Sequence, residues 1–93
     1  MEASFEIIYE KEVVHVDIPS LPNPWGRKIR ETIESKLTRN PELYGKPLRR
    51  GLSGYRKLRV GDYRVIYGLS RSTVRIVIID HRSTVYKEVL RRL

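Results

Sequence analysis

The segment Tyr55–Tyr67 constrains the fold more than any other part of the chain. Aromatic and β-branched residues alternate with polar ones on both sides of a Gly61-Asp62 dipeptide, a pattern typical of a β-hairpin with a two-residue turn. A turn of this length fixes which residues of the two strands lie opposite each other. The expected pairs are Val60 with Tyr63, Arg59 with Arg64, Leu58 with Val65 and Lys57 with Ile66.

This register separates the hairpin into two faces, because successive side chains of a strand point to opposite sides. One face consists of Leu58, Val60, Tyr63, Val65 and Tyr67, together with Arg56. The other face carries Lys57, Arg59, Arg64 and Ile66. No acidic residue lies opposite Arg64 in this register. The three cations of this second face are therefore expected either to lean apart in solvent or to bind an anion such as phosphate.

Upstream of the hairpin, the sequence predicts one strand and two helical segments. Ser4–Tyr9 alternates as a strand does, and Glu10–Asp17 is expected to be a short helical segment. Asn23 is expected to be a helix N-cap, with Pro24 at the first helical position. The helix that follows should run for about four turns and end before Pro41. Its apolar stripe consists of Trp25, Ile29, Ile33 and Leu37.

Downstream of this helix, Asn40–Gly54 is expected to be a loop, because proline and glycine recur in it. Ser70–Ser72 should turn the chain after the hairpin, and the β-branched run Thr73–Ile79 predicts a buried central strand. Ser83 or Thr84 would cap a final helix. The apolar residues of that helix are Val85, Val89, Leu90 and Leu93, with Tyr86 in the first turn.

These elements predict a single α+β domain over residues 1–93. We expect an antiparallel β-sheet, made of an N-terminal strand and a three-strand meander, with N-terminal helices packed on one face and a short C-terminal helix. The length of 93 residues and the 40% hydrophobic content support one modest core. No apolar run approaches the roughly 20 residues of a membrane span, so we expect a soluble, cytoplasmic protein that makes no membrane contact.

The net charge of +8 is distributed unevenly along the chain. Residues 1–45 contain 6 Lys and Arg against 8 Asp and Glu, whereas residues 46–93 contain 13 against 3. A protein that is merely soluble would scatter its charges. The asymmetry therefore favours a nucleic-acid surface in the second half of the chain.

Several kinds of catalytic site are excluded by the residues present. The chain has no cysteine, two distant histidines and no cluster of acids, so neither a thiolate nucleophile nor a zinc site is expected. The glycines lack the spacing of a phosphate-binding loop. Asp80, His81 and Ser83 are too close in sequence to take the facing positions of a catalytic triad. We therefore expect no metal and no other cofactor.

Lys, Arg, His and Tyr side chains on a sheet surface can cleave RNA without a metal ion. The 2′-hydroxyl is an internal nucleophile, so the protein has to align it, take its proton, stabilise the added negative charge and protonate the leaving 5′-oxygen. His81 is the natural proton carrier near neutral pH, and Lys57 is a second candidate for the base. His15 lies in the acidic half and is expected to be structural or exposed.

The segment Tyr55–Tyr67, followed by His81-Arg82 and Val85-Tyr86, resembles the RelE toxins of the RelE/ParE superfamily, the toxic partners of bacterial and archaeal toxin–antitoxin pairs. The resemblance is specific over residues 55–86, and the N-terminal third agrees in architecture alone. It implies a ribosome-dependent endoribonuclease that cuts mRNA in the decoding site and is inhibited by a cognate antitoxin. Contact with operator DNA would be indirect, through the antitoxin.

The resemblance also implies roles for individual residues. Lys57 and Arg59 match basic positions of a strand, and Arg64 matches an arginine thought to stabilise the transition state. Arg82 matches an arginine after the last strand, and Tyr86 a tyrosine thought to stack on or position the RNA. The predicted catalytic set is Lys57, Arg59, Arg64, His81, Arg82 and Tyr86, and the predicted RNA-binding set is Arg49, Arg50 and Arg56.

Alternatives stay open at this stage. Some active members of the family have lysine at the position of Tyr55 and arginine at that of Asp80, so the general base is not fixed. A ParE-like inhibitor of DNA gyrase would share the fold without nuclease activity, and a non-catalytic basic RNA-binding module would share the charge. Tyr86 could simply pack on the sheet, and Arg82 could pair with Asp80 or with the C-terminal helix.

Overall fold

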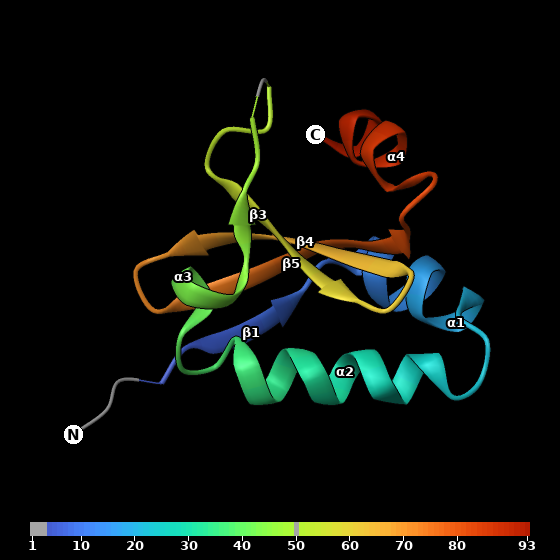
Figure 1. Cartoon of the computed structure of the whole chain (residues 1–93), viewed down its shortest axis with the longest axis horizontal. Coiled ribbons are helices and arrows are strands. Elements are labelled where there is room, and N and C mark those ends of the chain that lie inside the picture. Colours follow the sequence, from blue (N-terminus) through green and yellow to red (C-terminus); the bar gives the residue numbers. More distant parts are fainter. Residues whose placement is uncertain (1–3, 50) are drawn as a thin grey trace.

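The computed structural model describes residues 4–49 and 51–93, which form a five-stranded sheet with helices on both sides (Figure 1). The strand order is β1-β5-β4-β3-β2. No helix in the described residues is long and apolar enough to cross a membrane. The strands are β1 (Glu6–Tyr9), β2 (Lys46–Pro47), β3 (Tyr55–Val60), β4 (Tyr63–Ser70) and β5 (Thr73–His81), and the helical segments are η1 (Val13–Asp17, a π-helical turn), α1 (Ile18–Ser20), α2 (Trp25–Lys36), α3 (Pro41–Tyr44) and α4 (Val85–Arg92).

The antiparallel meander β3–β4–β5 forms the centre of the sheet, and the α+β prediction is confirmed. The hairpin has the predicted register, with Val60 opposite Tyr63 and Arg59 opposite Arg64. Gly61 has a φ of 60°, the left-handed conformation that a tight hairpin turn requires and that glycine adopts without strain.

Two edge strands differ from the prediction. β1 pairs with β5 in parallel, starting with Glu6 opposite Thr73, so the sheet is mixed rather than antiparallel throughout. The segment expected to be a loop contains α3 and the short strand β2, in which Lys46 pairs with Lys57 of β3. Both differences involve pairing between segments that are not adjacent hairpin arms, and the local residue pattern does not specify such pairing.

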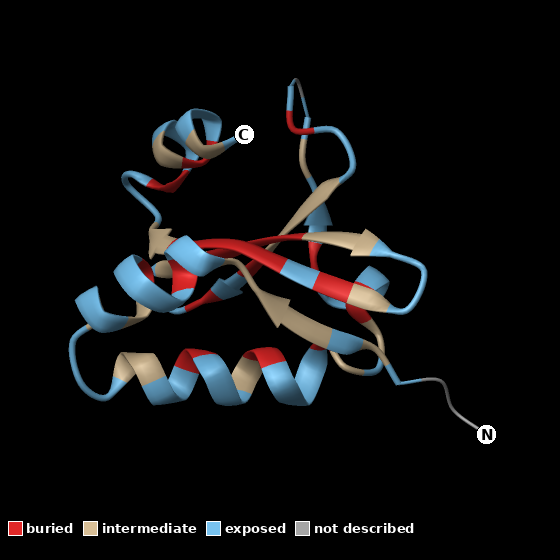
Figure 2. Ribbon diagram, turned by 180° about the vertical axis from the view of Figure 1, so that it is seen from behind, coloured by how far each residue is buried: buried red, intermediate tan, exposed pale blue. Residues whose placement is uncertain are grey.

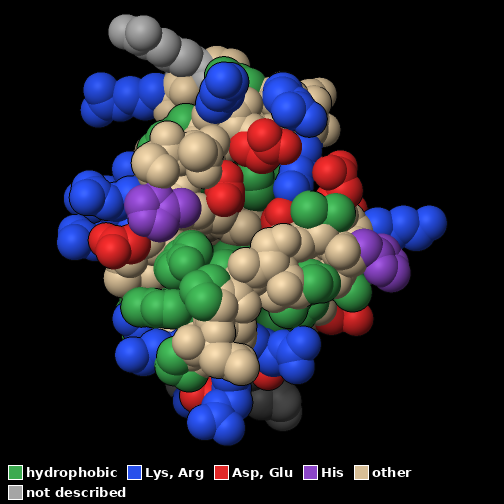
Figure 3. Space-filling model, turned by 90° about the vertical axis from the view of Figure 1, so that its right-hand side faces the viewer, with side chains coloured by type: hydrophobic (Ala, Val, Ile, Leu, Met, Phe, Trp, Pro, Cys, Tyr) green, Lys and Arg blue, Asp and Glu red, His purple; other side chains and the backbone are tan. Residues whose placement is uncertain are grey.

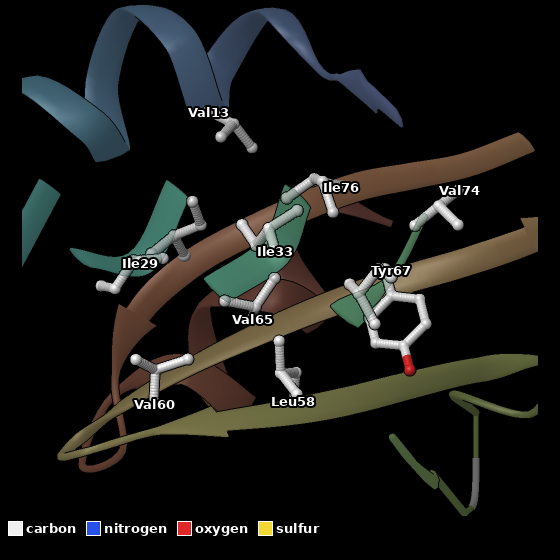
Figure 4. Close-up of a cluster of buried hydrophobic side chains, with 11 residues drawn as sticks. Val13, Ile29, Ile33, Leu58, Val60, Val65, Tyr67, Val74 and Ile76 are labelled. Atoms are coloured by element: carbon white, nitrogen blue, oxygen red, sulfur yellow. The ribbon is translucent and has the colours of Figure 1, made fainter. Parts of the chain in front are cut away.

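One face of the sheet packs on α2 (Figures 1 and 4). The predicted stripe residues Ile29, Ile33 and Leu37 are completely buried, and Figure 2 shows buried positions along the sheet-facing side of the helix. Trp25 lies at the edge of this core, where its ring centroid is 5.3 Å from that of Tyr63. The strands contribute Leu58, Val60, Val65, Tyr67, Val74, Ile76 and Ile79 to the same cluster.

The ends of α2 lie elsewhere than predicted. The helix begins at Trp25, Pro24 occupies the N-cap position, and no side chain makes a capping hydrogen bond. The backbone N–H of Trp25 donates instead to the carbonyl of Pro22 at 2.7 Å, so the preceding turn takes over the role expected of Asn23. The helix ends at Lys36, and proline at position 41 begins α3 rather than ending α2.

The other face of the sheet is partly covered by α4. Val85 and Val89 are completely buried and pack in a second cluster that includes Ile66 and Ile78. Leu90 and Leu93, the other apolar residues of the predicted helix, are 60% and 54% exposed. The inner position of the last turn is taken by Arg92 instead, three residues after Val89, as helical periodicity allows.

Arg92 and Asp17 form a bidentate ion pair in which only 9% and 6% of the two side chains are exposed. The guanidinium Nη1 donates to Asp17 Oδ2 at 2.8 Å and Nη2 donates to Oδ1 at 2.6 Å. Nη1 also donates to the carbonyl of Val77, and the N–H of Ile79 donates to Asp17 Oδ2. The hydrogen bond to Asp17 raises the pKa of Arg92. The pair therefore joins η1, β5 and α4.

Tyr67 closes the hydrophobic core between α2 and the sheet at the end next to α3. Its hydroxyl donates to the carbonyl of Pro41 at 2.7 Å, and its ring lies so close to Gly45 that a side chain at position 45 would collide with it. Arg56 donates to the carbonyls of Glu42 and Gly45 at 3.1 and 2.8 Å. These contacts hold α3 and β2 against the sheet. Burial of the phenol raises the pKa of Tyr67 to about 12.

We expect Arg92→Met to reduce the free energy of unfolding by about 3 to 5 kcal/mol, because it leaves the Asp17 carboxylate buried without its partner. Urea denaturation monitored by circular dichroism measures the change. The double variant Asp17→Asn/Arg92→Met should recover much of the loss, since no charge is then buried. Arg91→Met is the matched control, because that side chain is 73% exposed. Equal effects of the two single substitutions would contradict the role of the ion pair.

Tyr67 should make the stability of the fold sensitive to high pH. Its pKa is about 12 in the folded protein against the ordinary value of 10.0, so its contribution is complete below pH 10 and is lost as the pH rises through 12. We expect Tyr67→Phe to lower stability by about 1 kcal/mol at pH 8 and to reduce the further loss between pH 10 and 12. Urea unfolding at several pH values tests this, with the exposed Tyr44→Phe as control. If the free energies of unfolding of the wild-type and Tyr67→Phe proteins change in parallel between pH 10 and 12, Tyr67 is not the source of the pH sensitivity.

Candidate active site

The sheet face under α4 brings together the cations of the hairpin. Arg59 of β3 and Arg64 of β4 are directly opposite each other, and such pairs share a face with β-carbons about 5 Å apart. Lys57 lies two residues before Arg59 on the same strand and therefore on the same face. Arg59 is exposed and Arg64 half-buried. Three positive side chains thus lie beside one another on an accessible surface.

Lys57 and Tyr86 are in direct contact, although they are 29 positions apart in the sequence. The Lys57 ammonium donates to the Tyr86 hydroxyl at 2.9 Å and lies 5.4 Å from the centre of its ring. Tyr86 is 36% exposed. Val85, the residue before it, is buried against the sheet, and this anchoring directs the first turn of α4 toward β3. Tyr86 thus contacts a lysine of the sheet surface and also keeps an accessible side, so packing on the sheet does not describe its whole environment.

Arg64 is held over the hairpin turn. Its Nη1 donates to the carbonyls of Gly61 and Tyr63 at 3.0 and 2.9 Å. A guanidinium has five N–H donors, and these two bonds involve Nη1 alone. The position of the side chain is thereby fixed while its other nitrogen atoms keep donors for a ligand.

Asp80 lies opposite Arg64 on β5, and this corrects the expectation that no acid shares the face of that arginine. The hairpin pattern specifies only the pairing of β3 with β4, whereas the acid comes from the third strand. Asp80 Oδ2 accepts a hydrogen bond from the hydroxyl of Thr84 at 2.7 Å. The carboxylate therefore also anchors the start of α4. Thr84 is the N-cap residue as predicted, but its side chain makes no capping bond to the helix backbone.

His81 lies on the other face of the sheet. It is paired with Tyr63, whose ring centre is 5.7 Å away in an edge-to-face arrangement. The N–H of Ser83 donates to His81 Nδ1 at 3.1 Å, so the neutral imidazole carries its proton on Nε2. The structure consequently separates His81 from Lys57, Arg59 and Arg64, with which the sequence grouped it.

Arg82 pairs with the hairpin turn rather than with Asp80 or α4. Its backbone N–H donates to the carbonyl of Asp62 at 2.8 Å, and its Nε is 3.6 Å from the Asp62 carboxylate. The two side chains are 63% and 70% exposed. An ion pair this exposed contributes at most about 1 kcal/mol, so it can be exchanged for a phosphate.

The three residues predicted to bind RNA have different surroundings. Arg49 is exposed in the loop between β2 and β3. Arg56 lies on the α2 face, where its bonds to backbone carbonyls make it part of the fold. Arg50 lies outside the described residues.

A cleft of about 430 Å³ separates α1 from α4 at the end of β5. His81 lines it, as do Tyr63, Asp80 and Glu88, but Lys57, Arg59 and Arg64 do not. Figure 3 shows this end of the molecule, with Lys and Arg side chains around its edge and acidic side chains nearer its centre. Among residues 4–49 and 51–93, no group of three or more His, Cys, Asp or Glu side chains could hold a metal ion.

Three kinds of comparison relate the chain to known proteins. The family described as ParE toxin of type II toxin-antitoxin system, parDE, matches residues 11–86. Toxin RelE of Mycobacterium tuberculosis is 37% identical over 73 residues, which are 76% of this chain and 75% of that protein.

Two solved structures share the fold. In the toxin–antitoxin complex RelBE2 of M. tuberculosis, a chain with 30% identity aligns with a TM-score of 0.80 over 89% of this chain and 97% of its own. In the RelB–RelE complex of Methanococcus jannaschii, the identity is 22% and the TM-score 0.65, over 85% and 94% of the two chains.

The hairpin cations should bind single-stranded RNA in a salt-dependent manner. Each phosphate neutralised contributes about −0.7 to the slope of log affinity against log salt concentration. We expect Arg59→Gln to make this slope shallower by about that amount, measured by fluorescence anisotropy with a labelled oligonucleotide. Arg27→Gln on α2, where the side chain is 84% exposed, should leave the slope unchanged. An affinity that is equal at low and high salt would contradict an anion site at the hairpin.

Proposed function

Because the chain belongs to the RelE/ParE family of toxins of type II toxin–antitoxin systems, we propose that it is a ribosome-dependent endoribonuclease that cleaves mRNA and so inhibits translation. The observation that supports this most is the contact between Lys57 and Tyr86 on the face that carries Arg59 and Arg64. A proton-transfer pair and two guanidinium groups are the components that metal-independent RNA cleavage needs.

In the proposed reaction, Arg59 and Arg64 bind the scissile phosphate. The two arginines are a directly opposite pair of like charge on one face and repel each other, and a phosphate bound by both removes that repulsion. The 2′-oxygen attacks phosphorus, the bond to the 5′-oxygen breaks, and the phosphate carries an additional negative charge in the transition state. By analogy with single oxyanion-hole donors, each guanidinium could contribute about 3 to 4 kcal/mol to its stabilisation.

Proton transfer is assigned to Lys57 and Tyr86. Lys57, as the neutral amine, takes the proton of the attacking 2′-hydroxyl, and Tyr86 donates its hydroxyl proton to the leaving 5′-oxygen. The hydrogen bond between the two side chains then lets the Lys57 ammonium return a proton to the Tyr86 oxygen, so that both groups regain their starting state. Both groups lie on the face of the two arginines, whereas His81 does not. The proposal therefore replaces the imidazole, which the sequence suggested as the proton carrier, with this pair.

A cognate antitoxin is the proposed protein partner. The two RelBE structures similar to this fold are complexes of a toxin with its antitoxin. The net charge of +8 favours a partner segment rich in Asp and Glu, and the exposed Leu90 of α4 and Leu93 at its end offer apolar contacts. Such a segment would block the access of mRNA and the ribosome to the hairpin face. This chain would contact operator DNA only indirectly, through the antitoxin.

A second candidate function is inhibition of DNA gyrase without nuclease activity. The ParE description of the matching family and the carboxylate of Asp80 opposite Arg64 favour it. A supercoiling assay with purified gyrase separates the two candidates, because only the gyrase inhibitor should act in the absence of ribosomes and mRNA.

We expect Arg64→Ala to lower mRNA cleavage about 100- to 1,000-fold and to weaken ribosome binding much less, because Arg64 acts mainly on the transition state. Primer extension on translating ribosomes measures cleavage, and co-sedimentation measures binding. Arg27→Ala, on the far side of the sheet, is the control. A proportional loss of both quantities would identify Arg64 as a docking residue, and a wild-type protein that inhibits gyrase but leaves mRNA intact would establish the second candidate.

A further inference from the structure

A second hollow opens on the same sheet face as Lys57, at the end away from the Arg59–Arg64 pair. It has a volume of about 380 Å³, and Tyr55, Gly68 and Arg75 line it together with the hydroxyl residues Ser70 and Thr73. Neither the predicted catalytic set nor the predicted RNA-binding set includes any of these residues. We refer to this hollow as the Tyr55 cleft.

The Tyr55 ring rests on a glycine. Tyr55 of β3 and Gly68 of β4 are directly opposite each other, and a β-carbon built at Gly68 would be only 3.3 Å from Cε1 of the ring. Part of the ring packs against the second core cluster, which includes Leu52 and Ile66, and the remainder lines the cleft. The aromatic side chain is thus held by the sheet while a portion of it stays accessible.

Two cations lie near this ring, one across the sheet and one along the strand. Arg75 of β5 is opposite Gly68, its side chain is 51% exposed, and its contact with Glu10 is long, at 3.8 Å. Lys57 lies two residues after Tyr55 on the same face, about 7 Å along the strand. That spacing is within the span of neighbouring nucleotides in an extended single strand. Proteins that bind single-stranded nucleic acid combine aromatic rings on which bases stack with positive charges that contact the backbone.

We propose that the Tyr55 cleft binds one base of single-stranded RNA, roughly 13 Å along β3 from the phosphate proposed to lie between Arg59 and Arg64. The base stacks on Tyr55, Arg75 contacts the adjoining phosphate, and the hydroxyls of Ser70 and Thr73 are in position to bond with the edge of the base. The inference rests on the proposed function, since it assigns a further part of the same substrate.

A 2′-O-methyl RNA oligonucleotide tests the cleft directly, because it lacks the 2′-hydroxyl and cannot be cleaved. The fluorescent base 2-aminopurine, placed at successive positions, should be quenched most strongly at the position that stacks on Tyr55. Tyr55→Leu should abolish this quenching and weaken binding roughly 5- to 150-fold, the range typical of one stacked base. Tyr55→Phe should preserve both, and Tyr44→Leu, at a tyrosine that is 47% exposed on α3, should change neither.

A second variant and a second assay make the outcome decisive. Gly68→Ala should weaken the quenching with Tyr55 intact, because the new β-carbon displaces the ring. Thermal unfolding verifies that each variant is folded. If Tyr55→Leu and Gly68→Ala bind with wild-type affinity and quenching, the cleft is not a base site.

Cleavage on translating ribosomes then distinguishes the two proposals. Wild-type cleavage that Tyr55→Leu leaves unchanged in both kcat and KM would overturn the cleft alone. Absence of cleavage by the wild-type protein would overturn the nuclease, and position-specific quenching that depends on Tyr55 would in that case still establish the cleft as a site for RNA.

Discussion

The ion pair between Asp17 and Arg92 is the constraint on which the arrangement of the candidate site depends. Four hydrogen bonds, two within the pair and one each to Val77 and Ile79, join η1, β5 and α4, so the last turn of α4 has one position on the sheet. Replacing a buried ion pair by apolar residues often does not reduce stability. The contribution of this pair is therefore to specify the position of the helix, whereas the buried Val85 and Val89 supply most of the favourable free energy of packing.

The position of α4 explains why an aromatic side chain meets a lysine on the sheet surface. Asp80 holds the start of the helix through Thr84, and Asp17 holds its end through Arg92. With both ends fixed, the side of the helix that carries Tyr86 is turned toward β3, and its hydroxyl reaches Lys57. A site on a rigid helix and a rigid strand keeps its geometry better than a site on loops. The fold thus prepares this contact before any substrate arrives.

The sequence specified those parts of the structure that depend on neighbouring residues. The register of the hairpin follows from a two-residue turn, and the α2 stripe follows from helical spacing, and both are confirmed. The parallel pairing of β1 and the inward position of Arg92 depend on segments far apart in the chain, about which local periodicity carries no information. For the site, the hairpin register already placed Lys57, Arg59 and Arg64 on one face. It could not place His81, because the register of β4 with β5 shifts between Ile66 and Tyr67.

The three acidic residues in the basic half of the chain also help to hold the hairpin turn and α4 in place. Residues 46–93 contain only three acidic side chains, and each has a local partner: Asp62 pairs with Arg82, Asp80 with Thr84, and Glu88 with Arg91. Asp62 belongs to the hairpin turn, and the bonds of the other two lie within α4 or at its start. Their charge is thus directed to organising the rim of the site rather than to neutralising Lys57 and Arg59. The positive potential over the hairpin face is accordingly retained, and it is available to whatever polyanion the face binds.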